Sequence, residues 1–573
     1  MAEQENLERA KSDLEKQKSL NSYMPGARIQ MRNKPERPNQ LPKSFIKIRE
    51  HLNKEYNKVP RDDISDDIND DIIDDMEGEE IRTVGIEMFK QKRLIPLGKL
   101  INAGKPHFMK YPEVTDTTYN VLTFVAPMGG GKSTNVRSII YFTSKLEPDC
   151  INIIFDPMKM EFSKLGIKKD TLKKRMHLMN EKLYDPETGE TVRVVVEPDT
   201  LPVFHIIPRF ALNRENWSQE DMGYTSGFDK TTLAIMNKDG GFIFAEDASR
   251  MTEEQIFNCL NYREIRTDQT VHFYLRAAMR ICDNKYGSRN WFIDNLIEIL
   301  KENVRKFAEM AEADDYEDTE EGQGGEGKLS TNELQLIEQL EKYKDAGFFV
   351  RNNQERSQYC VDWRKFIKLG KVLNISFLSF KKTDKIGEDF VRGQADLILE
   401  RLIEISNEYM DALRKTDAEM PINEWEQYLL KHWKVNLWFE ESEIFTPRDC
   451  PVQNIKKWPC IKRLDYLMSF GRKYGFKNFG FITQRITKVN PLVFKESSHL
   501  FIGPIIGEER DQILSDFGVN KVSFKMIDKT GIEKEVQVRD VVTTLDKDKH
   551  EWVFIDKARK SICAIQSYDC PVG

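Results

Sequence analysis

Cysteine and histidine are scarce in this chain, with eight of each among 573 residues. No CxxC pair occurs and no histidine stands at ligand spacing, so the sequence argues against a zinc site and for reduced, unpaired thiols. Apolar runs of about 18 residues are also missing, so we expect no transmembrane helix. The first residues are highly charged and lack the apolar centre of a secretory signal. We therefore expect a cytoplasmic protein.

Net charge is only −7, so the overall charge gives no sign of a nucleic-acid-binding protein. Charge is instead concentrated near the N-terminus. Residues 28–61 carry ten Lys or Arg against three acids, and residues 62–80 carry eleven acids and no base. We interpret 1–82 as a charged, flexible segment, which either docks on a partner or is a solvated linker. A second acidic, glycine-rich stretch, 312–330, is typical of a disordered surface loop.

Short apolar runs that end in polar residues recur along the chain. Such runs are typical of strands in a parallel sheet that is buried on both faces. A hairpin pattern follows at 551–566, and the stretch 209–365 has mainly helical periodicity. We therefore predict an α/β core from 83–208 and 366–573 with a helical insertion at 209–365. The expected strands are 120–125, 151–156, 201–207, 371–378, 435–441, 479–484 and 498–503.

The stretch "VAPMGGGKST" directly follows the first of these runs. Backbone N–H groups can wrap a phosphate only where side chains are absent, which explains the glycines. A lysine can reach the β- and γ-phosphate oxygens, a serine hydroxyl can bind Mg²⁺, and the helix that follows directs its N-terminus at the anion. We therefore predict a P-loop that binds ATP and Mg²⁺. Its expected residues are Ala126, Pro127, Met128, Gly129, Gly130, Gly131, Lys132, Ser133 and Thr134.

A P-loop also needs a carboxylate-bearing strand, and "VNLWFEESEIF" supplies one. We expect Glu440 to take part in Mg²⁺ binding and Glu441 to act as the general base for the attacking water. The strand "FGFITQR" ends in Gln484, which can contact the γ-phosphate or that water. These residues should converge at the carboxyl ends of strands in one sheet.

The order of these motifs resembles the FtsK–HerA superfamily of P-loop ATPases, particularly its conjugation and secretion members. The resemblance covers roughly 84–208 and 366–573 and includes "FDPMKMEF" and "ITQR". It implies a RecA-like core, a homo-hexameric ring, and ATP-driven movement of DNA, or of protein in some members. A ring also requires an arginine at the neighbouring subunit's site, for which Arg472 and Arg485 are the candidates.

Three departures from the family pattern matter. Glu440 stands where Asp is usual, Ala126 replaces the first P-loop glycine, and the membrane anchor of coupling-type members is missing. The last departure favours a ring that works alone or is recruited by its N-terminal segment to a portal or membrane channel.

Three functions stay open at this stage. The first is an ATP-driven translocase that moves DNA, without regard to its sequence, in genome packaging, conjugation or segregation. The second is a type IV secretion-like ATPase for channel assembly or protein export, and the third is an ATP-gated scaffold with vestigial hydrolysis. DNA-stimulated ATPase activity separates the first from the second, and measurable turnover separates both from the third.

Overall fold

The structure is a computed structural model of the chain. The N-terminal segment 1–82 and residues 315–330 of the predicted acidic loop lie outside the residues that it describes. The described residues are 83–84, 93–104, 106–110, 120–157, 161–166, 182–184, 191–194, 200–201, 203–212, 241–260, 269–314, 331–360, 362–367, 372–377, 385–416, 433–448, 459–505, 507–528, 530–557, 559–568 and 570.

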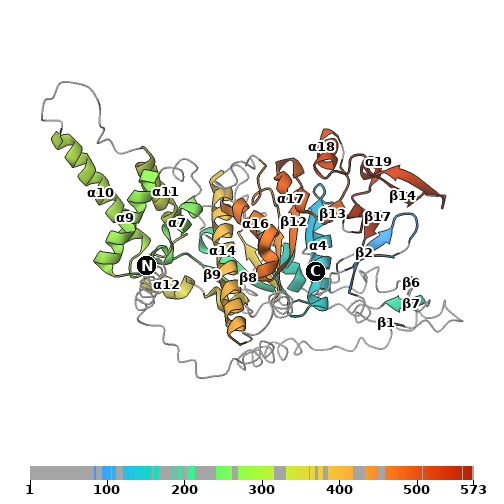
Figure 1. The fold of residues 1–573 in the computed structure, drawn as a ribbon, viewed down its shortest axis with the longest axis horizontal. Coiled ribbons are helices and arrows are strands. Elements are labelled where there is room, and N and C mark those ends of the chain that lie inside the picture. The colour runs from blue at the N-terminus through green and yellow to red at the C-terminus, as the bar shows by residue number, and fades with distance from the viewer. Residues whose placement is uncertain are drawn as a thin grey trace, which may run out of the picture. The chain divides into compact units, whose positions relative to one another are not determined.

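A twelve-stranded sheet organises the fold, in the order β3-β2-β17-β16-β13-β4-β12-β11-β5-β10-β8-β9. The strands from β13 to β9 pair in parallel, and the four at the other end are antiparallel. The course of the chain through these elements can be followed in Figure 1. The strands are β2 (Leu94–Leu100), β3 (Pro106–Lys110), β4 (Asn120–Val125), β5 (Ile151–Asp156), β8 (Val203–Pro208), β9 (Gly241–Phe244), β10 (Val372–Ser376), β11 (Val435–Phe439), β12 (Phe476–Thr483), β13 (His499–Ile502), β16 (Glu551–Asp556) and β17 (Ser561–Ser567).

The predicted α/β fold with a mainly parallel sheet is confirmed. Each expected apolar run forms a strand of this sheet, and the predicted hairpin is formed by β16 and β17. Several boundaries differ by one to three residues, and β12 ends at Thr483, so Gln484 follows it. The difference that matters most is that β11 ends at Phe439, so the acids after it lie in a turn. Strand β9 was not predicted and lies within the stretch that we expected to be helical.

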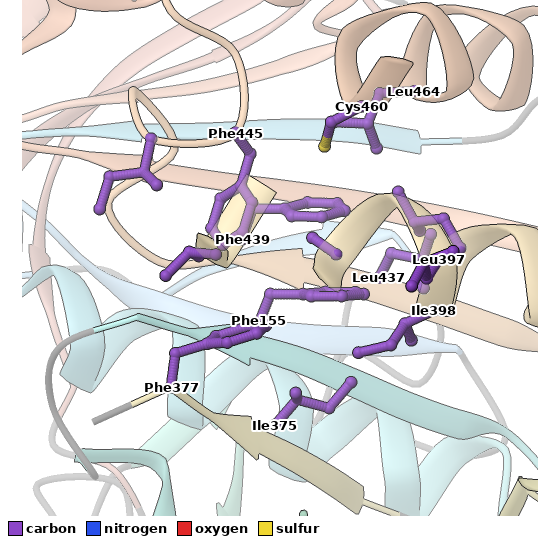
Figure 2. Packing of buried hydrophobic residues seen from close by; sticks show 14 of the residues in the cluster. Phe155, Ile375, Phe377, Leu397, Ile398, Leu437, Phe439, Phe445, Cys460 and Leu464 are labelled. Atoms are coloured by element: carbon purple, nitrogen blue, oxygen red, sulfur yellow. The ribbon is translucent and has the colours of Figure 1, made fainter. Parts of the chain in front are cut away.

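Each face of the sheet has its own apolar core, as alternation of side chains along the strands requires. Leu122 and Phe124 of β4 pack with helix α4 (Lys132–Leu146) on one face. On the other face, Phe155 and Phe439 pack with helices α14 (Lys385–Thr416) and α16 (Pro459–Phe470). Figure 2 shows this second core, with the strand phenylalanines facing Leu397 and Ile398 of α14 and Leu464 of α16.

Three phenylalanines form a stacked row across neighbouring strands. Phe155, Phe439 and Phe481 are register partners on β5, β11 and β12. Their ring centroids lie 4.8 Å and 5.4 Å apart, with nearly parallel planes. Phe445, from the turn after β11, packs edge-on against two of these rings. The row therefore anchors the backbone that carries the acids after β11.

Four buried asparagines form a second row, the asparagine ladder, across four neighbouring strands. Asn120 donates to Asn478 (3.1 Å), Asn478 donates to Asn436 (2.7 Å), and Asn436 donates to Asn152 (3.0 Å). Asn152 then donates to Ser144 of α4 (2.9 Å). Buried amides of this kind are costly unless they are paired, so the ladder favours a single alignment of β4, β12, β11 and β5.

Four described helices of the predicted insertion pack against one another, α7 (Glu253–Leu260), α9 (Gln269–Tyr286), α10 (Ile293–Asp314) and α11 (Thr331–Asp345). Helix α7 also packs against α14, and α12 (Asn353–Tyr359) packs against β9. Glu246, just after β9, accepts hydrogen bonds from Gln394 (2.5 Å) and Arg401 (3.0 Å) of α14. Within this part of the chain a buried carboxylate thus connects the end of β9 to the longest helix.

The remaining elements are smaller. They are the sheet of β1 (Thr83–Val84), β6 (Lys182–Tyr184) and β7 (Thr191–Val194), the hairpin of β14 (Ser523–Ile527) and β15 (Glu533–Gln537), and helices α13 (Trp363–Ile367), α17 (Pro491–Glu496), α18 (Glu508–Asp516) and α19 (Val538–Thr544).

Among the described helices, none combines the length and apolar character needed to cross a lipid bilayer.

The asparagine ladder generates a stability prediction. Asn436→Ala should lower the free energy of unfolding by about 1–3 kcal/mol, because the buried amide of Asn478 loses its acceptor. The exposed Asn353→Ala should change it by less than about 0.5 kcal/mol. Urea unfolding of the two variants, followed by circular dichroism, measures the difference. Equal stability of both would show that the ladder contributes nothing.

Candidate nucleotide site

The loop between β4 and α4 has the backbone conformation of a phosphate cradle. Gly129 and Gly131 have φ angles of 81° and 79°, in the left-handed region that favours glycine. A Cβ on Gly130 would lie 2.9 Å from the Cβ of Ala126, so this position also needs glycine. All three glycines therefore have a structural reason, and the alanine at 126 leaves enough room for the turn.

The start of α4 has no side-chain cap. Gly131 is the N-cap, no side chain caps this end, and no acid stands in the first turn. The first N–H groups of a helix have no acceptor within the helix, so a phosphate can take them. Ser133 and Thr134 are half-buried here, whereas Pro127 and Met128 before them are exposed.

Lys132 is buried and its ammonium group is held over the loop. Its Nζ donates to the carbonyl oxygens of Ala126 (2.8 Å) and Pro127 (3.0 Å). Arg137, one turn further along α4, donates to the carbonyl of Ser133 (3.3 Å) and to the Thr134 hydroxyl (3.4 Å). Both cations of this end of α4 are therefore directed at the P-loop residues.

Glu440 and Glu441 occupy the turn directly after β11, and both are buried. The Glu440 N–H donates to the Phe155 carbonyl of β5 (3.0 Å) and so extends the sheet by one residue. Glu441 then has a φ of 47°, in the left-handed region. A non-glycine residue there costs about 1–3 kcal/mol and is often found at functional sites.

Gln484 reaches the acid turn from the neighbouring strand. Its Nε2 donates a hydrogen bond to Oε1 of Glu441. Strand β12, which Gln484 follows, pairs with β4 on one side and β11 on the other, with Thr483 opposite Val125. The P-loop, Glu440, Glu441 and Gln484 thus stand at the carboxyl ends of three adjacent strands in one parallel sheet.

Glu443 is a site residue that the sequence interpretation missed. Burial and then the charge of Glu441 raise the pKa of Glu443 to about 8, and its carboxyl is hydrogen-bonded to Glu441. Glu443 also accepts a hydrogen bond from the Thr483 hydroxyl (2.8 Å). The Glu443 carboxyl is consequently expected to keep its proton at neutral pH. The only sequence signal was a third acid two residues after the expected base.

Asp156 is a second residue that was missed. It ends β5, is fully buried, and follows Phe155, the register partner of Phe439. This register places Asp156 next to Glu440 at the same edge of the sheet. The signal was visible in the run "INIIFD", whose last residue is a carboxylate.

The donor set fits Mg²⁺ bound chiefly through a nucleotide. The described residues contain no group of three or more His, Cys, Asp or Glu side chains that could hold a metal ion alone. Mg²⁺ usually takes one or two protein carboxylates and several oxygens from phosphate and water. Ser133 and Glu440 offer oxygens of the right kind at the edge where the P-loop lies.

The two candidate arginines lie at opposite ends of β12. Arg485 is exposed and follows Gln484 directly. Arg472 lies in the 3₁₀ turn Gly471–Tyr474, before the strand begins. The eight residues of β12 separate the two positions by roughly 25 Å. Within one chain the structure therefore brings only Arg485 near the P-loop edge.

The turn after β11 and the turn after β12 are joined by backbone pairing. Pro447 and Val489 form an isolated antiparallel bridge. The N–H of Asn490 donates to the carbonyl oxygen of Thr446 (2.8 Å), and the N–H of Arg448 donates to the carbonyl oxygen of Lys488 (2.7 Å). The two turns that carry Glu441 and Gln484 are consequently held to each other beyond the site.

No protein-family model and no curated protein matches the chain. Solved structures similar to it include VirB4 of Thermoanaerobacter pseudethanolicus, at 11% identity over 82% of this chain and 96% of that chain, with a TM-score of 0.42. The bacterial conjugative coupling protein TrwBdeltaN70 matches at 11% identity over 84% of this chain and 92% of that chain, with a TM-score of 0.38. The genome packaging NTPase B204 from Sulfolobus turreted icosahedral virus 2 matches at 12% identity over 34% of this chain and 67% of that chain, with a TM-score of 0.19. Similarity at this level does not define an activity.

The raised pKa of Glu443 predicts that stability falls with rising pH. The folded chain keeps this proton up to about pH 8, whereas the unfolded carboxyl loses it near its ordinary pKa of 4.5. Stability from this group is therefore lost as the pH rises from 4.5 through 8. Glu443→Gln cannot ionise, so its Tm should fall less than that of the unmodified protein between pH 6 and 9. The exposed Glu302→Gln is the matched control, and parallel pH curves for all three proteins would contradict the assignment.

Proposed function

We propose that the chain is a P-loop ATPase that binds MgATP at the carboxyl edge of its sheet and hydrolyses it. The observation that carries the proposal is the convergence of the glycine cradle after β4, the acids after β11 and Gln484 after β12. A phosphate-binding loop alone would fit many nucleotide-binding proteins. Here two buried acids, Glu440 and Glu441, stand near the loop, and Glu441 accepts a hydrogen bond from Gln484, which follows the strand between β4 and β11. This combination supports hydrolysis.

The residues divide the chemistry among them. In the proposed complex Lys132 exchanges its two carbonyl acceptors for β- and γ-phosphate oxygens, and the N–H groups at the start of α4 bind the same phosphates. Ser133 and Glu440 would hold Mg²⁺, which would supply positive charge to neutralise the phosphates. Glu441 accepts the proton of the attacking water.

Gln484 is suited to report the state of the nucleotide. Its amide bonds to the proposed base, Glu441, and it stands next to the P-loop strand. In this proposal, loss of the γ-phosphate changes the partners of Gln484 and is transmitted to the turn after β12.

We further propose that hydrolysis moves DNA through a homo-hexameric ring in the cytoplasm. This finer proposal is supported by the resemblance of the motifs to the FtsK–HerA superfamily, and phosphate contacts without base readout are sufficient for such movement. The exposed Arg485, at the P-loop edge, and Arg472, at the far end of β12, both remain candidates for the neighbouring subunit's site.

Substitution of the P-loop lysine and of the base should separate binding from hydrolysis. Lys132→Ala should abolish ATP turnover, because the phosphates lose their cation. Glu441→Gln should bind ATP normally but hydrolyse it about 10²- to 10⁴-fold more slowly, because an amide cannot accept the proton. Single-turnover hydrolysis and equilibrium ATP binding measure the two effects.

The matched control is the neighbouring acid. Glu440→Gln should weaken Mg²⁺ dependence rather than trap ATP. If Glu440→Gln traps ATP and Glu441→Gln turns over normally, the two roles must be exchanged. Normal turnover of Lys132→Ala would overturn the P-loop assignment itself.

Addition of DNA should distinguish the cargo. We expect duplex DNA of any sequence to raise the ATPase rate several-fold at low salt, with the stimulation falling as salt rises. Turnover that is indifferent to DNA would favour a secretion-like ATPase. Absence of turnover in the unmodified protein would leave an ATP-gated scaffold as the function.

A further inference from the structure

The ring of His550 lies directly against the P-loop. A Cβ placed on Gly131 would come within 2.9 Å of the His550 Cγ and 3.0 Å of its Cδ2. His550 precedes β16 and is remote in sequence from the loop. Gly131 therefore needs to be glycine for two reasons, its φ of 79° and the imidazole packed on it.

The backbone of His550 is fixed in an uncommon conformation. Its φ is 52°, in the left-handed region where histidine and asparagine are among the tolerated residues. Its carbonyl accepts a hydrogen bond from the Ser567 N–H of β17 (3.0 Å), and its N–H donates to Lys547 (3.1 Å). The turn is closed by a bond from the Asp546 N–H to Glu551 (2.8 Å). The backbone of His550 is thus held by the C-terminal hairpin, and the residue stays partly exposed.

The order of strands shows which part of a nucleotide reaches this ring. On one side of β4 lie β12 and β11, with Gln484 and the acids expected at the γ-phosphate. On the other side lie β13 and then β16, which His550 precedes. A triphosphate held by the loop with its γ end toward the acids leaves the loop on the His550 side. Two strand spacings, roughly 10 Å, suffice for the ribose and base.

From this placement we propose that His550 stacks on the base of the bound nucleotide and so forms the nucleoside end of the site. The inference rests on the proposed function, because it takes the γ-phosphate to lie beside Glu440 and Glu441. A flat imidazole beside the cradle offers a π face to any purine, and stacking of this kind favours a nucleotide over its bare phosphate chain. The P-loop would supply phosphate affinity, and the C-terminal hairpin would supply selectivity for a nucleoside.

The test compares ATP with inorganic tripolyphosphate, which lacks ribose and base. His550→Asn removes the aromatic ring and tolerates the positive φ, and His550→Phe restores a ring without imidazole nitrogens. Lys549→Ala, an exposed neighbour in the same turn, is the control. Binding of ATP and of tripolyphosphate to each full-length protein is measured by calorimetry with Mg²⁺ present, and circular dichroism checks the fold.

We expect His550→Asn to raise the Kd for ATP about 10-fold or more and to leave the Kd for tripolyphosphate unchanged. His550→Phe should recover ATP binding, and Lys549→Ala should match the unmodified protein. Unchanged ATP binding in His550→Asn would overturn the inference, and equal weakening of both ligands would show that His550 only supports the loop. If the unmodified protein binds tripolyphosphate but not ATP, or neither ligand, the proposed function itself fails.

Discussion

Alignment of four parallel strands is the constraint on which the site depends, and the asparagine ladder enforces it. Residues in a strand alternate between faces, so a slip of one position would move every apolar side chain to the wrong core. Apolar strands such as β4, β11 and β5 pack well in several alignments. The amides of Asn120, Asn478, Asn436 and Asn152 pair in one alignment only, and this alignment brings the ends of β4, β12 and β11 level.

Above the ladder, the stacked phenylalanines carry that alignment to the active edge. Phe155 directly precedes Asp156, and Phe439 directly precedes Glu440. Packing of these rings with Phe481 therefore fixes the backbone of β5 and β11 up to the residue before each acid. Glu441 then turns into the left-handed region, which brings its carboxylate to both Gln484 and Glu443. The packed row below holds this strained turn, and the raised pKa of Glu443 limits the charge that is buried there.

Much of this arrangement could be predicted from the sequence, because apolar runs with polar ends and a glycine-lysine turn are local patterns. The strands, the P-loop and the acids after β11 were recognisable for that reason. Glu443 and Asp156 were visible only as carboxylates near strand ends, and His550 gave no local signal, because the role of each depends on contacts that form in the fold. Asn436 is an example of this limit on prediction from sequence. A single asparagine in an apolar strand has no evident role until the structure places three other asparagines on neighbouring strands beside it.

The pairing of the turn after β11 with the turn after β12 has a mechanical consequence. Because Pro447 bridges Val489 and Arg448 binds both Lys488 and Asp516, backbone and side-chain bonds join the two turns to helix α18. In the proposed ATPase, a displacement that begins at Glu441 or at Gln484 would therefore reach the same helix. A swing of α18 about the sheet edge would then need no change in the packed cores beneath it.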